Sequence, residues 1–573
     1  MNVHLKYIIL LVVMLQVKGL FAQERDNDTI DGGTVTVVKP YTPKIADAFK
    51  VKEVPILNDS TTITKKKITY NIFSIPVAST FTPAKGKAAA VDKEKSIKRY
   101  DNYASLGGGS YLTILGEVYI NHTISRTEQV GGYFSHHSSS GNIESVNFDT
   151  NFSKTGLNAY YKNQQRDISW TVKGGVDLQY ANWYGLPNQE LTVFDVGHSF
   201  YTAHIDGNVK FDNSIFKNAS VLFRRFGDDQ DSGENRFVLK TGLAIPLAGE
   251  TVHTTVTFDY LGGEFENSYF DNDKLNYSNI AIGIKPSYTL QLEDLTLDLG
   301  VNVVYFNDIE TTASKFFIYP NIAANYPLVN DLLIAYGSIE GGLQQNSYYS
   351  FAQENSFVSP SLVVAPTDQA YKALVGVKGK LSKSMSYNIL THYSADNNRA
   401  LFTSNTALAS AAKNYQFANS FGVVYDDLKT FAFEGELHID INRNFELGFE
   451  AGYYAYTTEN ESEAWNLPNI KASAFLDVQI DEHWFAGANL FFIGERKDRL
   501  MESEGALLLP IETQVTLKSY FDANAHIGYK VTERLSAFAK ANNIANQNYS
   551  RWVNYPVQGI QFLAGITYQF DLY

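Results

Sequence analysis

The feature of this sequence that most limits its fold is a period-two alternation of apolar and polar residues. The final run places Phe562, Ala564, Ile566, Tyr568 and Phe570 on one side, with Gly, Thr and Gln between them. Successive strand residues point to opposite faces, so this run predicts a strand with one apolar and one polar face. About ten such residues are enough to cross the ~25 Å apolar band of a membrane barrel.

The same pattern recurs from about Leu106 to the C-terminus, and the connections between the runs alternate in length. Short turns such as Leu247–Val252 and Lys530–Glu533 alternate with long polar loops. Short turns on one side and long loops on the other are typical of outer-membrane barrels, with the short side periplasmic. The clearest alternating runs are 252–260, 295–305, 431–442 and 517–529.

These runs predict an all-β protein, a transmembrane antiparallel β-barrel of 20–22 strands, and we take 22 as the number. Counting back from a periplasmic C-terminus gives about twenty strands up to Gln129, plus a run at Ser110–His122. That odd number conflicts with a periplasmic N-terminus. One strand is therefore split or merged, and Phe421–Ile441, interpreted as one long strand, is the first place to look.

The N-terminal part is different in kind. Residues 1–22 predict a secretory signal, with Lys6, the apolar run Ile8–Val13 and a cleavage position after Ala22; a membrane anchor is the alternative. Residues 23–105 contain five of the 15 prolines and carry a net charge of about +4, with little periodicity. We expect an extended periplasmic or lumenal segment there, and the barrel over 106–573.

Charge and composition exclude several kinds of function. Residues 106–573 carry a net charge of about −20, which disfavours nucleic-acid binding. Solvated external loops explain this charge; an acidic lumen that attracts cations or the basic N-terminal segment is the alternative. The chain has no cysteine, so disulfides, thiolate catalysis and cysteine-bound metals are excluded.

We expect no catalytic residues, no metal and no cofactor, and therefore no enzyme. His136 and His137 lie near serines but lack an evident carboxylate partner. The acidic run Gly227–Glu234 lacks the spacing of a calcium loop and predicts a solvated loop. Gly107–Gly109 predicts a hinge or bulge. Loop aromatics, which fit an interfacial girdle better than a ligand site, occur at Trp183, Tyr184, Trp465, Trp552 and Tyr555.

Three stretches together resemble the barrel of TonB-dependent outer-membrane receptors. They are Phe421–Leu437, Asn489–Asp498 with its aromatic-Gly-x-Arg order, and Ala541–Tyr549, which is similar to an Asn-Leu-Phe-Asn loop before the last strand. The resemblance covers about 106–573 and implies the outer membrane of a Gram-negative cell. It departs from the family at the N-terminus, since only 83 residues (23–105) stand where those receptors carry a plug of roughly 130–150 residues, and no plug-like run is recognisable.

Two short features concern partners and assembly. The run Thr34, Val35, Thr36, Val37 and Val38 resembles the TonB box, which binds its energising partner by adding a strand; an ordinary extended segment is the alternative. Barrels of this kind end on an aromatic residue that serves as an assembly signal. The candidates for that signal are Phe570 and Tyr573.

Three functions remain open. The first is a transport barrel that takes up a solute through its loops and lumen, with outer-membrane lipid and a TonB-type complex as partners. The second is a plugless accessory or scaffold barrel in a larger outer-membrane complex that transports or assembles proteins. The third is a passive porin. The solute and the ligand-binding residues are not predicted.

Overall fold

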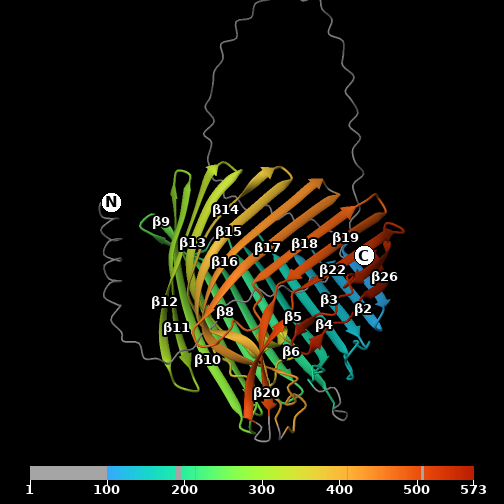
Figure 1. Ribbon diagram of the computed structural model, residues 1–573. Helices are drawn as coiled ribbons and strands as arrows, with labels where there is room; N and C mark the ends of the chain where they lie inside the picture. The colour runs from blue at the N-terminus through green and yellow to red at the C-terminus, as the bar shows by residue number, and fades with distance from the viewer. Residues whose placement is uncertain are drawn as a thin grey trace, which may run out of the picture. The chain divides into compact units, whose positions relative to one another are not determined.

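The strands of the computed structural model form one closed antiparallel barrel (Figure 1). The structure describes residues 100–187, 195–212, 214–408, 411–442, 444–504 and 509–572. The barrel closes where β1 pairs with β26, in register from Asn102 opposite Phe570 to Gly109 opposite Leu563. Closure leaves no free edge in the wall, which is the condition for a sheet to span a membrane.

The barrel has 22 strands, so the predicted fold class and strand number are confirmed. In the described ranges the barrel strands are β1(Asn102–Gly109), β2(Thr113–Thr123), β3(Glu128–Ser139), β4(Phe152–Gln164), β5(Ile168–Asn182), β6(Gly197–Phe211), β7(Phe216–Asp228), β8(Gly233–Leu247), β9(Glu250–Phe265), β10(Leu275–Leu292), β11(Leu295–Asp308), β12(Ser314–Val329), β13(Leu333–Gln344), β14(Thr367–Ser382), β15(Met385–Ser404), β16(Phe421–Asn442), β17(Phe445–Thr458), β18(Ile470–Gln479), β19(Trp484–Ile493), β22(Tyr520–Lys530), β23(Leu535–Asn542) and β26(Gln561–Phe570).

The odd strand count is explained by a strand that the sequence pattern did not show. β1 begins at Asn102, four residues before the predicted barrel boundary, and its last residues are Gly107–Gly109. The predicted hinge or bulge at these glycines is therefore wrong. They lie in regular register with β26, and a Cβ at Gly109 would lie 2.1 Å from the Phe562 carbonyl oxygen. Phe421–Asn442 is a single 22-residue strand, as interpreted.

Outward-facing positions along the strands carry exposed apolar side chains. Leu178 on β5, Ile205 on β6 and Phe433 on β16 are each more than half exposed. Asp177 precedes Leu178 on β5, and Glu434 follows Phe433 on β16. Since successive strand residues point to opposite faces, both carboxylates point to the lumen. Such a belt is stable only against hydrocarbon, so the barrel is a transmembrane one. No described helix is long and apolar enough to cross a membrane.

The two ends of the barrel differ. At the end that holds the start of β1 and the end of β26, consecutive strands are joined by two to four residues. At the other end the connections reach 22 residues between β13 and β14 and 26 residues between β19 and β22. These long connections contain short elements of their own: α2(Tyr348–Glu354), the hairpin of β20(Arg496–Glu504) and β21(Leu509–Leu517), and the pair β24(Ser550–Trp552) and β25(Tyr555–Pro556).

Candidate functional site

Long loops from opposite walls of the barrel meet over its long-loop end. The β5–β6 loop and the β15–β16 loop leave the wall ten strands apart in a ring of 22. Nevertheless the Asn419 side-chain amide donates to the Trp183 carbonyl at 2.9 Å, and that of Asn414 donates to the Gly197 carbonyl at 3.2 Å. The chain therefore crosses the mouth of the barrel.

Two further loops join at the same place. The Tyr184 hydroxyl of the β5–β6 loop donates to the carbonyl of Pro556 in the β23–β26 loop at 3.0 Å. From the β9–β10 loop, the Tyr269 hydroxyl donates to the Thr406 carbonyl at 2.7 Å, and the Gln416 amide donates back to the Tyr269 carbonyl at 2.9 Å. We call the described residues of these connections the loop cap: 183–187, 195–196, 266–274, 345–366, 405–408, 411–420 and 543–560.

The loop cap has an aromatic core. Phe357 stacks on Tyr555 with ring centroids 3.7 Å apart, and Trp183 stacks on His198 at 3.9 Å. Burying a large aromatic side chain removes more apolar area from water than any other choice, which gives a loop assembly its own stability. The buried members contributed by the cap are Trp183, Tyr269, Tyr348, Phe351, Ala352, Val358, Leu362, Val364, Tyr415, Trp552, Val553 and Tyr555.

Two buried carboxylates on strands β7 and β8 bind helix α2. The Tyr348 hydroxyl donates to Asp228 at 2.6 Å, and the Tyr348 backbone N–H donates to Glu234 at 2.6 Å. Asp228 is 4% and Glu234 1% exposed. Arg224 also reaches Glu234, at 3.4 Å. Since charge-assisted hydrogen bonds are the strong ones, α2 has a specific anchor five strands away from the strands that carry it.

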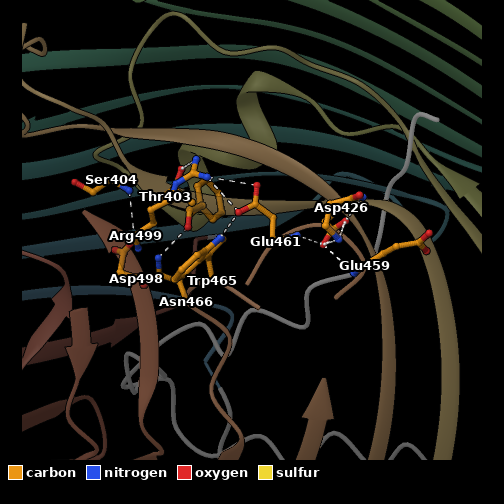
Figure 2. Close-up of polar contacts among 11 residues, drawn as sticks. Thr403, Ser404, Asp426, Glu459, Glu461, Trp465, Asn466, Asp498 and Arg499 are labelled. Atoms are coloured by element: carbon orange, nitrogen blue, oxygen red, sulfur yellow. Dashed lines mark hydrogen bonds and ion pairs between the residues drawn. The ribbon is translucent and has the colours of Figure 1, made fainter. Parts of the chain in front are cut away.

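A second polar cluster fixes the β17–β18 loop beside the cap (Figure 2). The Asp426 carboxylate at the top of β16 accepts the backbone N–H groups of Glu459, Asn460 and Glu461 at 2.8–3.1 Å. The Glu461 carboxylate then accepts from the Trp465 indole at 2.7 Å. It also pairs with Arg499 of β20 at 3.2 Å (Figure 2). We call this cluster with Asp498 the clasp, because it joins the β20–β21 hairpin to the loop.

Asp498 is the buried acid of the clasp. One carboxylate oxygen accepts the backbone N–H groups of Ser404 at 3.3 Å and Arg499 at 2.8 Å; the other has no hydrogen-bond partner among the described residues. Burial raises the pKa of Asp498 to about 7, against the smaller opposing effects of its hydrogen bonds and of Arg496. Asp498 therefore changes charge near neutral pH.

The structure corrects what was expected of the loop aromatics. A girdle would leave them at the membrane surface, but Trp183, Trp465 and Tyr555 are each 1% exposed and Trp552 is 8% exposed. Trp183, Trp552 and Tyr555 belong to the packed interior of the loop cap, where their large apolar area is removed from water. Trp465 donates to Glu461 in the clasp. The girdle interpretation is wrong for these residues.

The acidic run Gly227–Glu234 is also different from its prediction. Only its residues 229–232 form the turn between β7 and β8; Asp228 ends β7, Glu234 lies in β8, and both carboxylates are buried rather than solvated. Their oxygens accept hydrogen bonds from Tyr348 and from the turn itself. Within the described ranges, no group of three or more His, Cys, Asp or Glu side chains could hold a metal ion.

The described residues include two of the other positions that the sequence singled out, His136 and Phe570. His136 lies in β3, not in a loop, and its ring nitrogens contact Thr155 at 2.8 Å and Ser138 at 3.1 Å. Phe570 is the last residue of β26. Residues 1–99, and with them the predicted signal and Thr34–Val38, lie outside the described residues, as does Tyr573.

Among known proteins, this chain is similar to solved structures only. No protein-family model matches the chain, and no curated protein matches it. Solved structures do match: the pyoverdine outer membrane receptor FpvA from Pseudomonas aeruginosa PAO1 has a TM-score of 0.62 at 12% identity, over 83% of this chain and 80% of that one. The ferric-catecholate import receptor Fiu from K12 E. coli gives 0.59 at 12%, over 82% of each chain. The FrpB iron transporter from Neisseria meningitidis gives 0.60 at 11%, over 82% of each chain.

The barrel therefore has the fold of TonB-dependent outer-membrane receptors, as the sequence resemblance implied. At 11–12% identity the likeness concerns the fold alone. No signal in the sequence singled out Asp426 or Asn419, and Asp228 and Glu234 were noted only as members of an acidic run that was expected to be solvated. The most useful signal in the sequence was the excess of Trp and Tyr in loops. Loops ordinarily favour Gly, Ser and Pro, so large aromatic residues there indicate burial.

Proposed function

We propose that this protein is an outer-membrane transport barrel that takes up a solute through its surface loops and lumen. The observation that carries the proposal is the closed 22-strand barrel with the fold of TonB-dependent receptors. The names of the matched receptors concern pyoverdine, ferric catecholates and iron, so ferric chelates are the first class of solute to screen. The surface loops and the lumen of the barrel would bind and conduct the solute, without a catalytic group.

The proposed setting is the outer membrane of a Gram-negative cell. Residues 1–22 would direct export, and the exposed apolar belt would contact lipid. The short turns would face the periplasm and the loop cap the outside. Residues 23–101 would then precede β1, whose first residue, Asn102, lies at the periplasmic end of the barrel.

A TonB-type energising complex is the proposed periplasmic partner. Thr34–Val38 would add a strand to it, with backbone groups giving affinity and alternate valines giving specificity. Val37→Pro removes one backbone N–H of that strand and should abolish co-purification of the partner. Val51→Pro, outside the run, is the matched control and should retain it.

An accessory barrel in a larger complex is the second candidate. One observation favours it: the mouth is covered by the barrel's own loops. A barrel that serves as a scaffold need not conduct solutes, so a closed mouth is compatible with that role.

Gentle detergent extraction from the native membrane, followed by mass spectrometry, separates the two candidates. Recovery of the barrel alone or with the TonB machinery supports transport, and a ligand screen follows. Recovery with other subunits in fixed stoichiometry contradicts the transport proposal and assigns the function to the complex.

A further inference from the structure

The lumen of a 22-strand barrel is wide enough to leak unless something fills it. In this chain the loops meet over one end: Asn419 of the β15–β16 loop donates to Trp183, ten strands away around the wall, and accepts from Tyr555 of the β23–β26 loop, five strands away. We propose that the loop cap is the permeability barrier of this pore, and that the segment 345–366 with α2 is the lid that must move for the pore to open. This inference does not depend on which solute or partner the barrel serves.

The packing of the cap fits a barrier. Its central side chains Trp183, Tyr348 and Tyr555 are each 1% exposed, and Asn419 is fully buried. Asn419 joins the layers: its amide donates to the carbonyls of Trp183 and Asn414, both at 2.9 Å, and its own carbonyl accepts from Tyr555. Side chains packed against one another in this way leave no room for water between them, which is what a permeability barrier requires.

The segment 345–366 has the geometry of a lid. Both of its ends continue into neighbouring strands, β13 and β14, while its contacts reach strands β6, β7 and β8, five to eight strands away around the wall. There Tyr348 donates to Asp228 and Glu234, and the carbonyl of Ser356 pairs with His198 at 2.7 Å. The lid is thus tethered along one edge and latched at the other.

The latch is also the part that can release without damage to the barrel. Asp228 and Glu234 stay on strands β7 and β8 when Tyr348 leaves, and their carboxylates can then be hydrated. The remaining cap loops keep their own contacts, such as that of Tyr269 with Thr406. Opening therefore exchanges a few buried hydrogen bonds and aromatic contacts for contacts with water or solute.

Planar-bilayer conductance of the full-length protein tests the proposal. The unmodified protein should conduct little. Tyr348→Ala, which removes the buried ring and the hydroxyl bond of the latch to Asp228, should raise the conductance by roughly tenfold, toward that of an open barrel. Asn419→Ala should also raise it, and gives a second readout if Tyr348→Ala does not insert. Tyr326→Ala, at an exposed position on the outer face of β12, is the matched control and should change nothing.

A companion deletion of residues 23–99 distinguishes this barrier from an N-terminal plug. If the cap is the barrier, the deletion leaves the conductance low. High conductance after the deletion, with no effect of Tyr348→Ala and Asn419→Ala, would overturn the proposal in favour of a plug. High conductance of the unmodified protein would overturn it as well.

Discussion

The two ends of the barrel are built from the same strands but by different rules. At the short-turn end two to four residues reverse the chain, and the turns bond only to their own hairpins and to the strand or turn next to them, as where Asp212 donates its N–H to the Asp167 carbonyl at 3.1 Å. At the long-loop end the connections leave their hairpins and join residues far apart in sequence, such as Tyr184 and Pro556. One end is therefore determined locally, and the other is a tertiary structure with a core.

This difference has an energetic meaning. A tight turn loses little entropy when it forms, because its ends are already close. A 22-residue loop loses far more and stays ordered only if burial compensates. The aromatic core of the loop cap and the carboxylates Asp228, Glu234 and Asp426 supply that compensation.

Removal of the central aromatic side chain should loosen the cap but not the barrel. Trp183→Ala should destabilise the closed cap by about 3–5 kcal/mol, the usual cost of truncating a buried Trp. Limited proteolysis of the long loops should accelerate, while heat-modifiable gel mobility stays that of a folded barrel. Phe270→Ala, at a position 74% exposed, is the control; equal proteolysis of the two variants contradicts a packed cap.

Removal of the Asp426 carboxylate should free the β17–β18 loop. Asp426→Ala leaves the N–H groups of Glu459, Asn460 and Glu461 without their acceptor, a loss of about 1.5–3 kcal/mol for bonds to a charged group. Hydrogen exchange at residues 459–469 should become faster. Glu310→Ala, in an exposed loop at the same end, should leave exchange there unchanged.

The clasp should be weaker at high pH. Burial raises the pKa of Asp498 to about 7, so the folded clasp holds a proton between about pH 4 and pH 7 that the unfolded segment does not. This contribution to stability is full below about pH 4 and is lost as pH rises through 7. Proteolysis of the hairpin should therefore be faster at pH 8 than at pH 6.

Asp498→Asn separates this effect from other titrations. The amide cannot ionise, so the difference in proteolysis between pH 6 and pH 8 should shrink markedly. The same pH difference in the variant and the unmodified protein would show that Asp498 is not its source.

A change at the short-turn end should have the smallest effect. Gly249 has a φ of +89° in the two-residue β8–β9 turn, so Gly249→Ala should cost about 1–2 kcal/mol of local strain. Folding yield in detergent should fall slightly, with loop proteolysis unchanged. A large rise in loop proteolysis would show that the two ends are not independent.

The contrast also explains what could be predicted. Period-two alternation is a local signal, so nearly every barrel strand was found, including the whole of Phe421–Asn442. β1 was missed because it is short and ends in three glycines. The strand predicted over 517–529 was joined across a break at 518–519, where the β20–β21 hairpin ends and β22 begins.

The loop cap could not be found by the same means. Its contacts join Asn419 to Trp183, 236 residues apart, and Tyr348 to Asp228, 120 residues apart. The alternation of apolar and polar residues concerns neighbours within one strand, so it does not indicate contacts between residues so far apart in the sequence. Asp228 and Glu234 looked like solvated acids because the residue that buries them, Tyr348, belongs to a distant loop.

Hydrogen exchange of the full-length protein in lipid nanodiscs tests the closed mouth most directly. Amides across 345–366 and 411–420 should exchange slowly, as barrel strands do. Tyr348 donates its N–H to buried Glu234, Ser359 donates its N–H to the Phe421 carbonyl at 2.9 Å, and Gln416 donates its N–H to the Lys413 carbonyl at 3.1 Å. Exchange of both segments at the rate of an unstructured chain would contradict the account, because the loops would then not close the barrel.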